Sequence, residues 1–399
     1  MYVPEGLRNG GVTMTQLQRS FLACTLVLIA STVACGLPAG IVVETATSQT
    51  TPSATRYVSP TPLPTGTASR TPTWTAIPTF TAAPTATRTP EHTFTATPLS
   101  PATATPRPEP PTILSQAEYQ VVETVILTNA GPGIAENVTL WVALVTSRPP
   151  YQEVLDSQAL PSVFEVVTDE YGNQYARFEF RDVSPGGSVE ATLTYQVSVS
   201  ELAHEVSHCH GRMPSLYLLP ETYVESDHPL VQALAREVSE RHDSPCGRLK
   251  ALYDYVVDHI TYSSYEAGDR GAVWALDHGS GDCTEFADAL LALSRASGIP
   301  ARFLEGVTYR EDVRADPSQI KHDWVEAYLP GHGWVPLDPT WGRLPNRRDI
   351  YFARMSPDHI IVTVGRNLST LGGYHYFYYR WVGEQISISH QEEWEVTKW

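Results

Sequence analysis

The sequence predicts an α+β fold preceded by an all-β, sandwich-like domain, and two patterns carry this prediction. Residues 113–201 consist of β-branched and aromatic runs with period-two alternation, separated by turns rich in glycine and proline. This pattern is typical of a β-sandwich. Farther on, two helix-periodic segments at 228–260 and 284–297 precede strand-like segments that continue to the C-terminus. Helices followed by strands indicate an α+β domain.

Strand-like segments follow the predicted helices of the second domain. The run YHYFYYRWV fits a strand packed on both faces better than it fits a substrate groove. The expected strands of this domain are residues 301–309, 322–329, 334–338, 358–364 and 374–382.

The charge of the chain excludes one broad class of function. The 399 residues include 27 basic and 44 acidic side chains, a net charge of −17. Residues 1–110 sum to +2, so the remainder sums to −19. So acidic a module repels phosphate backbones, and we expect no nucleic-acid partner. The simplest interpretation of this excess of acidic side chains is a well-solvated protein surface.

The N-terminus predicts export. In residues 1–35, Arg19 precedes an apolar run of 14 residues, 21–34, which suits a signal peptide and is too short to span a bilayer. Cys35 follows Thr-Val-Ala, a sequence that resembles a bacterial lipobox without its usual leucine. We expect Cys35 to carry a lipid anchor on the outer face of the cytoplasmic membrane or in the cell envelope. Ordinary signal cleavage at the same bond is the alternative.

Residues 36–112 are dominated by threonine and proline. Between positions 51 and 110, 31 of 60 residues are one or the other. Such a composition offers little to bury, so we expect a disordered stalk. The predicted domains are therefore a stalk, a β-sandwich over 113–201 and a catalytic domain over 215–399 with its core at 225–345.

Three segments carry residues suited to nucleophilic catalysis. Cys283 follows Gly-Asp at the start of a predicted helix, where free N–H groups and the helix dipole favour a thiolate and can hold an oxyanion. His322 and Asp338 lie on consecutive predicted strands. Cys283 would attack an acyl carbon, His322 would take its proton and later protonate the leaving amine, and Asp338 would orient the imidazole.

The hairpin register leaves one question about this trio open. A four-residue loop that pairs Leu329 with Trp334 would place His322 opposite Trp341. A bulge or a longer loop is then expected to bring His322 to Asp338.

These motifs resemble the core of the transglutaminase-like superfamily over roughly residues 225–345. The resemblance rests on GDCTEFADALLALSRASGIPAR, His-Asp-Trp-Val-Glu and Asp-Pro-Thr. It implies a papain-like fold, in which a helix-borne cysteine packs on an antiparallel sheet that carries the histidine and aspartate. It implies Cys283, His322 and Asp338 as the triad, with Tyr262 and Trp274 as candidates to complete the oxyanion hole.

The same resemblance implies a reaction class. We expect a thioester formed from protein or peptide amides, then released by hydrolysis or by transamidation, with no cofactor. The alternative is a non-catalytic envelope module with the same fold, which an intact triad disfavours. The sequence makes no prediction of oligomeric state.

A second motif competes for the active site. The segment from His204 through Glu205 to His208 matches the zinc-peptidase pattern H-E-x-x-H. It directly follows a strand-like run, and Gly211 and Pro214 would stop a helix soon after it, so we expect no metal there. A structural metal is a milder alternative, with the ligands His204, His208, Cys209, His210 and Cys246.

The remaining cysteines favour a disulfide over that metal. Outside the cytoplasm, Cys209 and Cys246 are expected to pair with each other. Cys24 would leave with the signal peptide. Cys283 is then the one free thiol expected in the folded, exported part of the chain.

Overall fold

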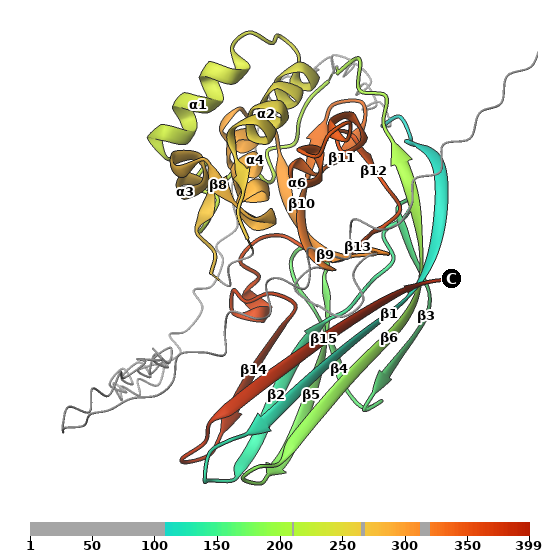
Figure 1. The fold of residues 1–399 in the computed structure, drawn as a ribbon, viewed down its shortest axis with the longest axis vertical. Helices are drawn as coiled ribbons and strands as arrows, with labels where there is room; N and C mark the ends of the chain where they lie inside the picture. The colour runs from blue at the N-terminus through green and yellow to red at the C-terminus, as the bar shows by residue number, and fades with distance from the viewer. Residues whose placement is uncertain (1–107, 210, 265–267, 312–319) are drawn as a thin grey trace, which may run out of the picture. The chain divides into compact units, whose positions relative to one another are not determined.

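A computed structural model describes residues 108–399, apart from 210, 265–267 and 312–319 (Figure 1). The predicted signal peptide, Cys35 and almost all of the predicted stalk lie outside the described residues. None of the described helices is long and apolar enough to cross a membrane.

The first part of the described chain forms two antiparallel sheets. Strand β1 pairs with β6 along nearly its whole length, from Thr112 opposite Ala203 to Thr128 opposite Ser188. Buried residues alternate with partly buried ones along both strands, as period-two patterning requires. The strands are β1 (Thr112–Asn129), β2 (Ala135–Ala143), β3 (Gln152–Leu160), β4 (Glu165–Thr168), β5 (Gln174–Val183) and β6 (Ser188–Ala203).

The last two strands of the chain return to these sheets. Strand β14 (Phe377–Val382) pairs with β2, and β15 (Ile388–Lys398) pairs with β1 (Figure 1). One sheet has the order β12-β6-β1-β15, with β3 also on β6 and β12 at Arg354–Met355, and the other has the order β14-β2-β5-β4. The predicted catalytic domain therefore does not keep its C-terminal strands. They cover edges of β1 and β2 that would otherwise present unpaired backbone groups.

Helices and a central sheet form most of the rest of the described chain. The expected helical segment 228–260 is two helices, because Ser244 caps a new one by accepting from the Gly247 N–H at 3.1 Å. The helix at Gly271–His278 was not predicted from the sequence, because it is short and has no side-chain cap. The helices are α1 (Pro229–Ser239), α2 (Pro245–His259), α3 (Gly271–His278) and α4 (Cys283–Ala296).

The central antiparallel sheet has the order β11-β10-β9-β13 and separates two hydrophobic cores. Val325 and Ala327 of β10 pack with the helices, whereas Trp324 packs with the core of the sandwich. Successive residues of β10 therefore face different surroundings. The strands are β9 (Ala301–Thr308), β10 (Lys321–Leu329), β11 (Gly333–Leu337) and β13 (His359–Val364).

Short elements join these parts. A parallel pair, β7 (Thr261–Tyr262) with β8 (Ser280–Gly281), leads directly into α4. The short helix α6 (Pro339–Gly342) follows β11. Two 3₁₀ turns complete the described elements, at Arg348–Ile350 and Ser369–Leu371. The candidate site residues therefore lie at three element ends: Cys283 at the N-terminus of α4, His322 at the start of β10 and Asp338 directly after β11.

Candidate active site

Cys283 lies in the first turn of α4, and its position is fixed by a capping box. The Asp282 carboxylate accepts from the Thr284 N–H at 3.0 Å, and Glu285 accepts from the Asp282 N–H at 3.1 Å. A Cβ at Gly281 would lie 2.4 Å from Cβ of Glu285, so only glycine permits this close approach. The Gly-x-Cys sequence therefore seats the sulfur at the helix N-terminus.

The β10–β11 hairpin brings His322 and Asp338 together through a shorter loop than the sequence suggested. Leu329 pairs with Gly333, so the loop has three residues instead of four. The register between Val325 and Leu337, continued by one residue, places Asp338 opposite Trp324, on the same face as His322. The expected bulge or longer loop was wrong. A shift of one residue moves a side chain to the other face of a sheet, and here it moved Asp338 to the face of His322.

Asp338 accepts hydrogen bonds from three directions. Its Oδ2 accepts from Nε2 of His322 at 3.0 Å and from Nε2 of His359 at 3.3 Å, while Oδ1 accepts from the Trp341 N–H at 3.0 Å. Burial alone would raise the pKa of Asp338, but His322 and His359 outweigh it and hold that pKa well below its ordinary value. Asp338 is therefore a carboxylate, and His322 must donate through Nε2, which leaves Nδ1 available.

His359 is a residue that the sequence analysis missed. Burial lowers its pKa, but hydrogen bonds to Asp338 and Asp358 raise it to about 9. Its Nδ1 lies 2.8 Å from Asp358. His359 is thus a buried imidazolium that bridges two carboxylates. It belongs to no motif, and only the pairing of β13 with β9 places it beside Asp338.

Two tryptophans hold the imidazole of His322. The rings of Trp341 and Trp324 stack on it at centroid distances of 5.2 and 5.8 Å. Stacking on both neighbours, at interplanar angles of 29° and 23°, limits rotation of the ring. The ring plane is therefore set by packing as well as by Asp338.

Cys283 and His322 line one cleft of about 750 Å³. Tyr262, an oxyanion-hole candidate, also lines it. The other candidate, Trp274, does not. Trp274 packs on the Arg270 guanidinium at 3.9 Å and on His278 at 4.4 Å. The other lining residues are Ser264, Thr308, Tyr309, Arg310, Lys321, Thr340, Trp341, Arg343, Leu344, Arg347, Tyr351 and Asp358.

The electrostatic setting of Cys283 differs from the sequence expectation. Burial, followed by the carboxylates of Asp323 and Asp282, raises the pKa of the thiol well above its ordinary value. A hydrogen bond from the Asp323 backbone acts in the opposite direction and is outweighed. The resting form is therefore the neutral thiol, although the helix N-terminus by itself favours a thiolate.

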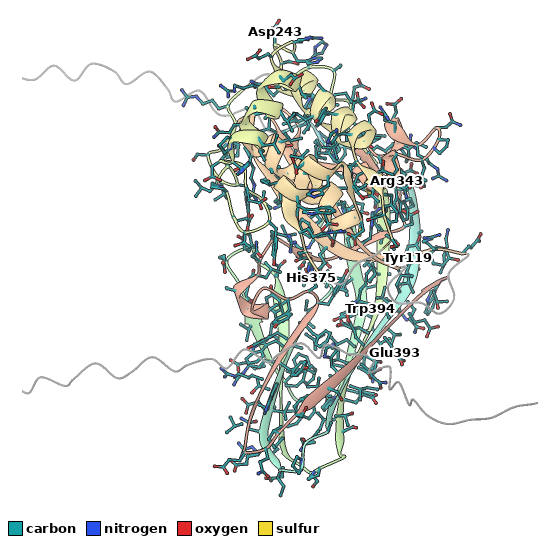
Figure 2. The ribbon with its side chains drawn as sticks, turned by 60° about the vertical axis from the view of Figure 1, so that its left-hand side comes forward. Tyr119, Asp243, Arg343, His375, Glu393 and Trp394 are labelled. Atoms are coloured by element: carbon teal, nitrogen blue, oxygen red, sulfur yellow. A yellow bond between two sulfur atoms is a disulfide. The ribbon has the colours of Figure 1, made fainter. Side chains whose placement is uncertain are left out.

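Asp323 lies on the helix-facing side of β10, next to a second polar cluster. Its Oδ2 accepts from Oγ1 of Thr284 at 2.6 Å. Burial and the charge of Glu305 raise its pKa to about 7, against the opposing effect of His375. His375 bonds to Glu305 and lies where the helical part meets the sandwich (Figure 2). This cluster was not predicted from the sequence.

The competing zinc motif does not adopt the geometry that it requires. His204, Glu205 and His208 follow β6 as irregular backbone, whereas H-E-x-x-H needs a helix to place both histidines on one side. The expectation of no metal peptidase at this motif thus has a structural reason.

Cys209 and Cys246 are joined in a disulfide with a Cα–Cα distance of 5.7 Å. Their sulfurs and His332 place three potential ligand atoms within 4.8 Å. Sulfurs bonded to each other offer no thiolate to a metal. His210 of the milder metal alternative lies outside the described residues. His322, Asp338 and His359 form a second close group, whose atoms are hydrogen-bonded to one another.

Comparison with known proteins agrees with this geometry. Residues 232–339 match the family model of the transglutaminase-like superfamily. This segment is a transglutaminase-like core. The match spans α1 to the start of α6 and includes Cys283, His322 and Asp338.

Two bacterial proteins are similar to part of this chain. An uncharacterized Bacillus subtilis protein is 32% identical over 128 residues, 28% of this chain and 17% of its own length. A Pseudomonas aeruginosa protein-glutamine gamma-glutamyltransferase is 31% identical over 128 residues, 30% of this chain and 19% of its own. The chain therefore spans less than a fifth of these relatives.

A solved structure extends the likeness beyond the transglutaminase-like core. It belongs to a candidate cysteine protease from Cytophaga hutchinsonii and matches with a TM-score of 0.53 at 17% identity. The match covers 72% of this chain and 92% of that one. At this identity the likeness concerns the fold: antiparallel sheets followed by a transglutaminase-like core.

Proposed function

We propose that this protein is a cysteine-dependent acyl-transfer enzyme acting on protein or peptide amides. The observation that carries the proposal is the hydrogen bond of 3.0 Å between Nε2 of His322 and Asp338, with Cys283 and His322 lining the same cleft. A nucleophile, a base and a group that orients the base are the parts that acyl transfer requires.

The first half of the reaction is acylation of Cys283, and it starts from the neutral thiol. Because Cys283 is a neutral thiol, its proton must leave as the sulfur attacks, and Nδ1 of His322 is the nitrogen free to take it. The sulfur–carbon bond forms, and the carbonyl oxygen becomes an oxyanion. The Cys283 N–H, at the first turn of α4, has no acceptor within the helix and can donate to this oxyanion. His322 then protonates the leaving nitrogen as the carbon–nitrogen bond breaks.

The second half regenerates the thiol. Water or a primary amine attacks the thioester, gives its proton to His322 and expels the sulfur, which recovers that proton. Water yields an acid, and an amine yields a new amide. Either reaction regenerates the free enzyme. Whether hydrolysis or transamidation occurs depends on which nucleophile reaches the thioester in the cleft. The name of the Pseudomonas relative supports a test with glutamine as acyl donor.

We propose that the enzyme acts outside the cytoplasm, held by a lipid on Cys35. The disulfide between Cys209 and Cys246 supports an oxidising compartment. The signal-like residues 1–35 support export.

The test is turnover of glutamine-containing peptides with and without a primary amine such as dansylcadaverine. Mass spectrometry separates deamidation, peptide cleavage and amine incorporation. We expect one of these products from the wild type, and none from Cys283→Ser. Labelling by iodoacetamide, followed on the Cys283 peptide, should slow on His322→Ala substitution.

Two results would contradict the proposal. One is a Cys283 thiol that iodoacetamide labels at the same rate with and without His322. The other is turnover that persists in Cys283→Ser. The first result would favour the alternative, a non-catalytic binding module with the same fold.

A further inference from the structure

The candidate active-site cleft carries a charge opposite to that of the protein. Among the described residues that line it, four are cationic (Arg310, Lys321, Arg343 and Arg347), and one is a carboxylate, Asp358. The chain as a whole has a net charge of −17. A cleft of one sign attracts ligands of the other sign, because its walls focus the field.

Some of these charges are already neutralised within the protein. Lys321 pairs with Glu392. Asp358 accepts from Nδ1 of His359 at 2.8 Å and from Ser356 at 2.6 Å. Arg310 has an interaction partner of its own. These three side chains therefore do not decide what the cleft attracts.

Arg343 and Arg347 are different. Both are exposed, and in the described part of the chain no carboxylate lies within 4.0 Å of either guanidinium. The next arginine, Arg348, forms an ion pair with Asp258, as is common for arginines in a chain with an excess of acidic residues. Two exposed cations without a carboxylate partner within this distance thus line the cleft.

The position of Arg343 ties this charge to the reacting groups. Its guanidinium lies 4.4 Å from the centroid of the Tyr262 ring, and Tyr262 lines the cleft together with Cys283. The segment that carries Arg343 follows α6, whose N-cap is Asp338. Figure 2 shows Arg343 at the surface of the helical part. The cationic rim is therefore built on the same short segment that orients His322.

We propose that the cleft selects acidic acyl donors, in which carboxylates flank the reacting amide and bind Arg343 and Arg347. The proposal rests on the proposed function and names its substrate class. Guanidinium groups bind carboxylates through paired N–H donors, a contact that uncharged side chains cannot make. Because the contacts are exposed, their contribution is modest and screened by salt.

The kinetic test uses peptides of equal length with one glutamine flanked by aspartate, serine or lysine. We expect kcat/KM about five- to tenfold higher for the aspartate peptide than for the serine peptide in low salt. The ratio should approach one in 0.5 M salt. Arg347→Glu should favour the lysine peptide, whereas Arg181→Glu, the same charge change on an exposed residue of β5, should leave the ratio unchanged.

A binding test separates this inference from the proposed function. Fluorescence anisotropy of labelled aspartate and serine peptides on Cys283→Ala needs no turnover. Preferential binding that Arg347→Glu reverses, combined with a wild type that turns over none of the peptides, would support the cationic rim and contradict the proposed reaction. Equal affinity for the two peptides, or a preference that survives both Arg347→Glu and Arg343→Gln, would overturn the inference. Circular dichroism of each variant verifies that it is folded.

Discussion

Consecutive residues of β10 belong to two clusters with similar chemistry. On one face, His322 and His359 bond to Asp338, and His359 also bonds to Asp358. On the helix-facing side, Asp323 lies near a cluster in which His375 bonds to Glu305 and, at 3.3 Å, to Asp269. Each cluster holds a histidine that bridges two carboxylates.

The two bridging histidines have the same electrostatic state. Carboxylates outweigh burial at both, so the pKa of His359 rises to about 9 and the pKa of His375 rises well above its ordinary value. Both are imidazolium ions that hold buried carboxylates in place. Neither has a ring nitrogen left for a substrate, because both nitrogens are engaged.

The difference between the clusters is a single histidine. His322 uses only Nε2 for a carboxylate and lines the cleft with Cys283. No described residue of the His375 cluster lines that cleft. Similar residue types thus give a site suited to proton transfer in one place and a structural ion network in the other. The distinction depends on a free nitrogen next to the nucleophile.

The largest expected effect is on His322. We expect His322→Gln to lower kcat/KM by about 10³- to 10⁴-fold, because no other imidazole in the described part of the cleft can take the thiol proton. Stopped assays of peptide turnover measure the loss. The midpoint of urea unfolding should stay close to that of the wild type. A loss below tenfold would mean that the two clusters do not differ in function.

The next effect concerns Asp338. We expect Asp338→Asn to lower kcat by about 10²- to 10³-fold, since a neutral amide no longer fixes the imidazole tautomer. Stability should fall as well, because the His359 imidazolium loses one of its carboxylates. Activity and unfolding are measured on the same preparation. Unchanged kcat would contradict the orienting role.

At His375 we expect the opposite of the result at His322: a loss of stability with little loss of activity. We expect His375→Gln to lower the free energy of unfolding by about 2 kcal/mol, because buried Glu305 loses its cation, which is itself partly screened by solvent. Activity per folded molecule should stay within tenfold of the wild type. The matched control is His390→Gln, an exposed histidine of β15. A catalytic loss as large as that of His322→Gln would remove the distinction between the clusters.

The smallest effect is a pH dependence that His359 imposes. Because its folded pKa of about 9 exceeds the ordinary value of 6.5, its stabilisation is complete below about pH 6.5 and is lost as the pH rises through 9. The part of this loss that falls between pH 7 and pH 9 is about 2 kcal/mol. Urea titrations at several pH values should show that His359→Gln flattens this decline. Identical slopes in wild type and variant would contradict the imidazolium assignment.

Sequence motifs predicted Cys283, His322 and Asp338 but few of the residues that surround them. Glycine before the cysteine, the histidine strand and the Asp-Pro-Thr turn are local patterns, and the structure brings His322 within hydrogen-bond distance of Asp338 on the cleft of Cys283. The catalytic roles stay a prediction. His359 and His375 belong to no local pattern, because strand pairing and the return of the chain to the sandwich place them.

The sequence by itself determined the element types, the β-rich and helical regions and the turn that seats Cys283, because these depend on neighbouring residues. Tertiary structure decided the rest. The three-residue loop set the face of Asp338, and edge pairing carried β14 and β15 to the sandwich. The surrounding carboxylates and burial made the Cys283 thiol neutral, where its helix alone favours the anion. Register, edge pairing and desolvation arise between segments distant in sequence, so no local pattern encodes them.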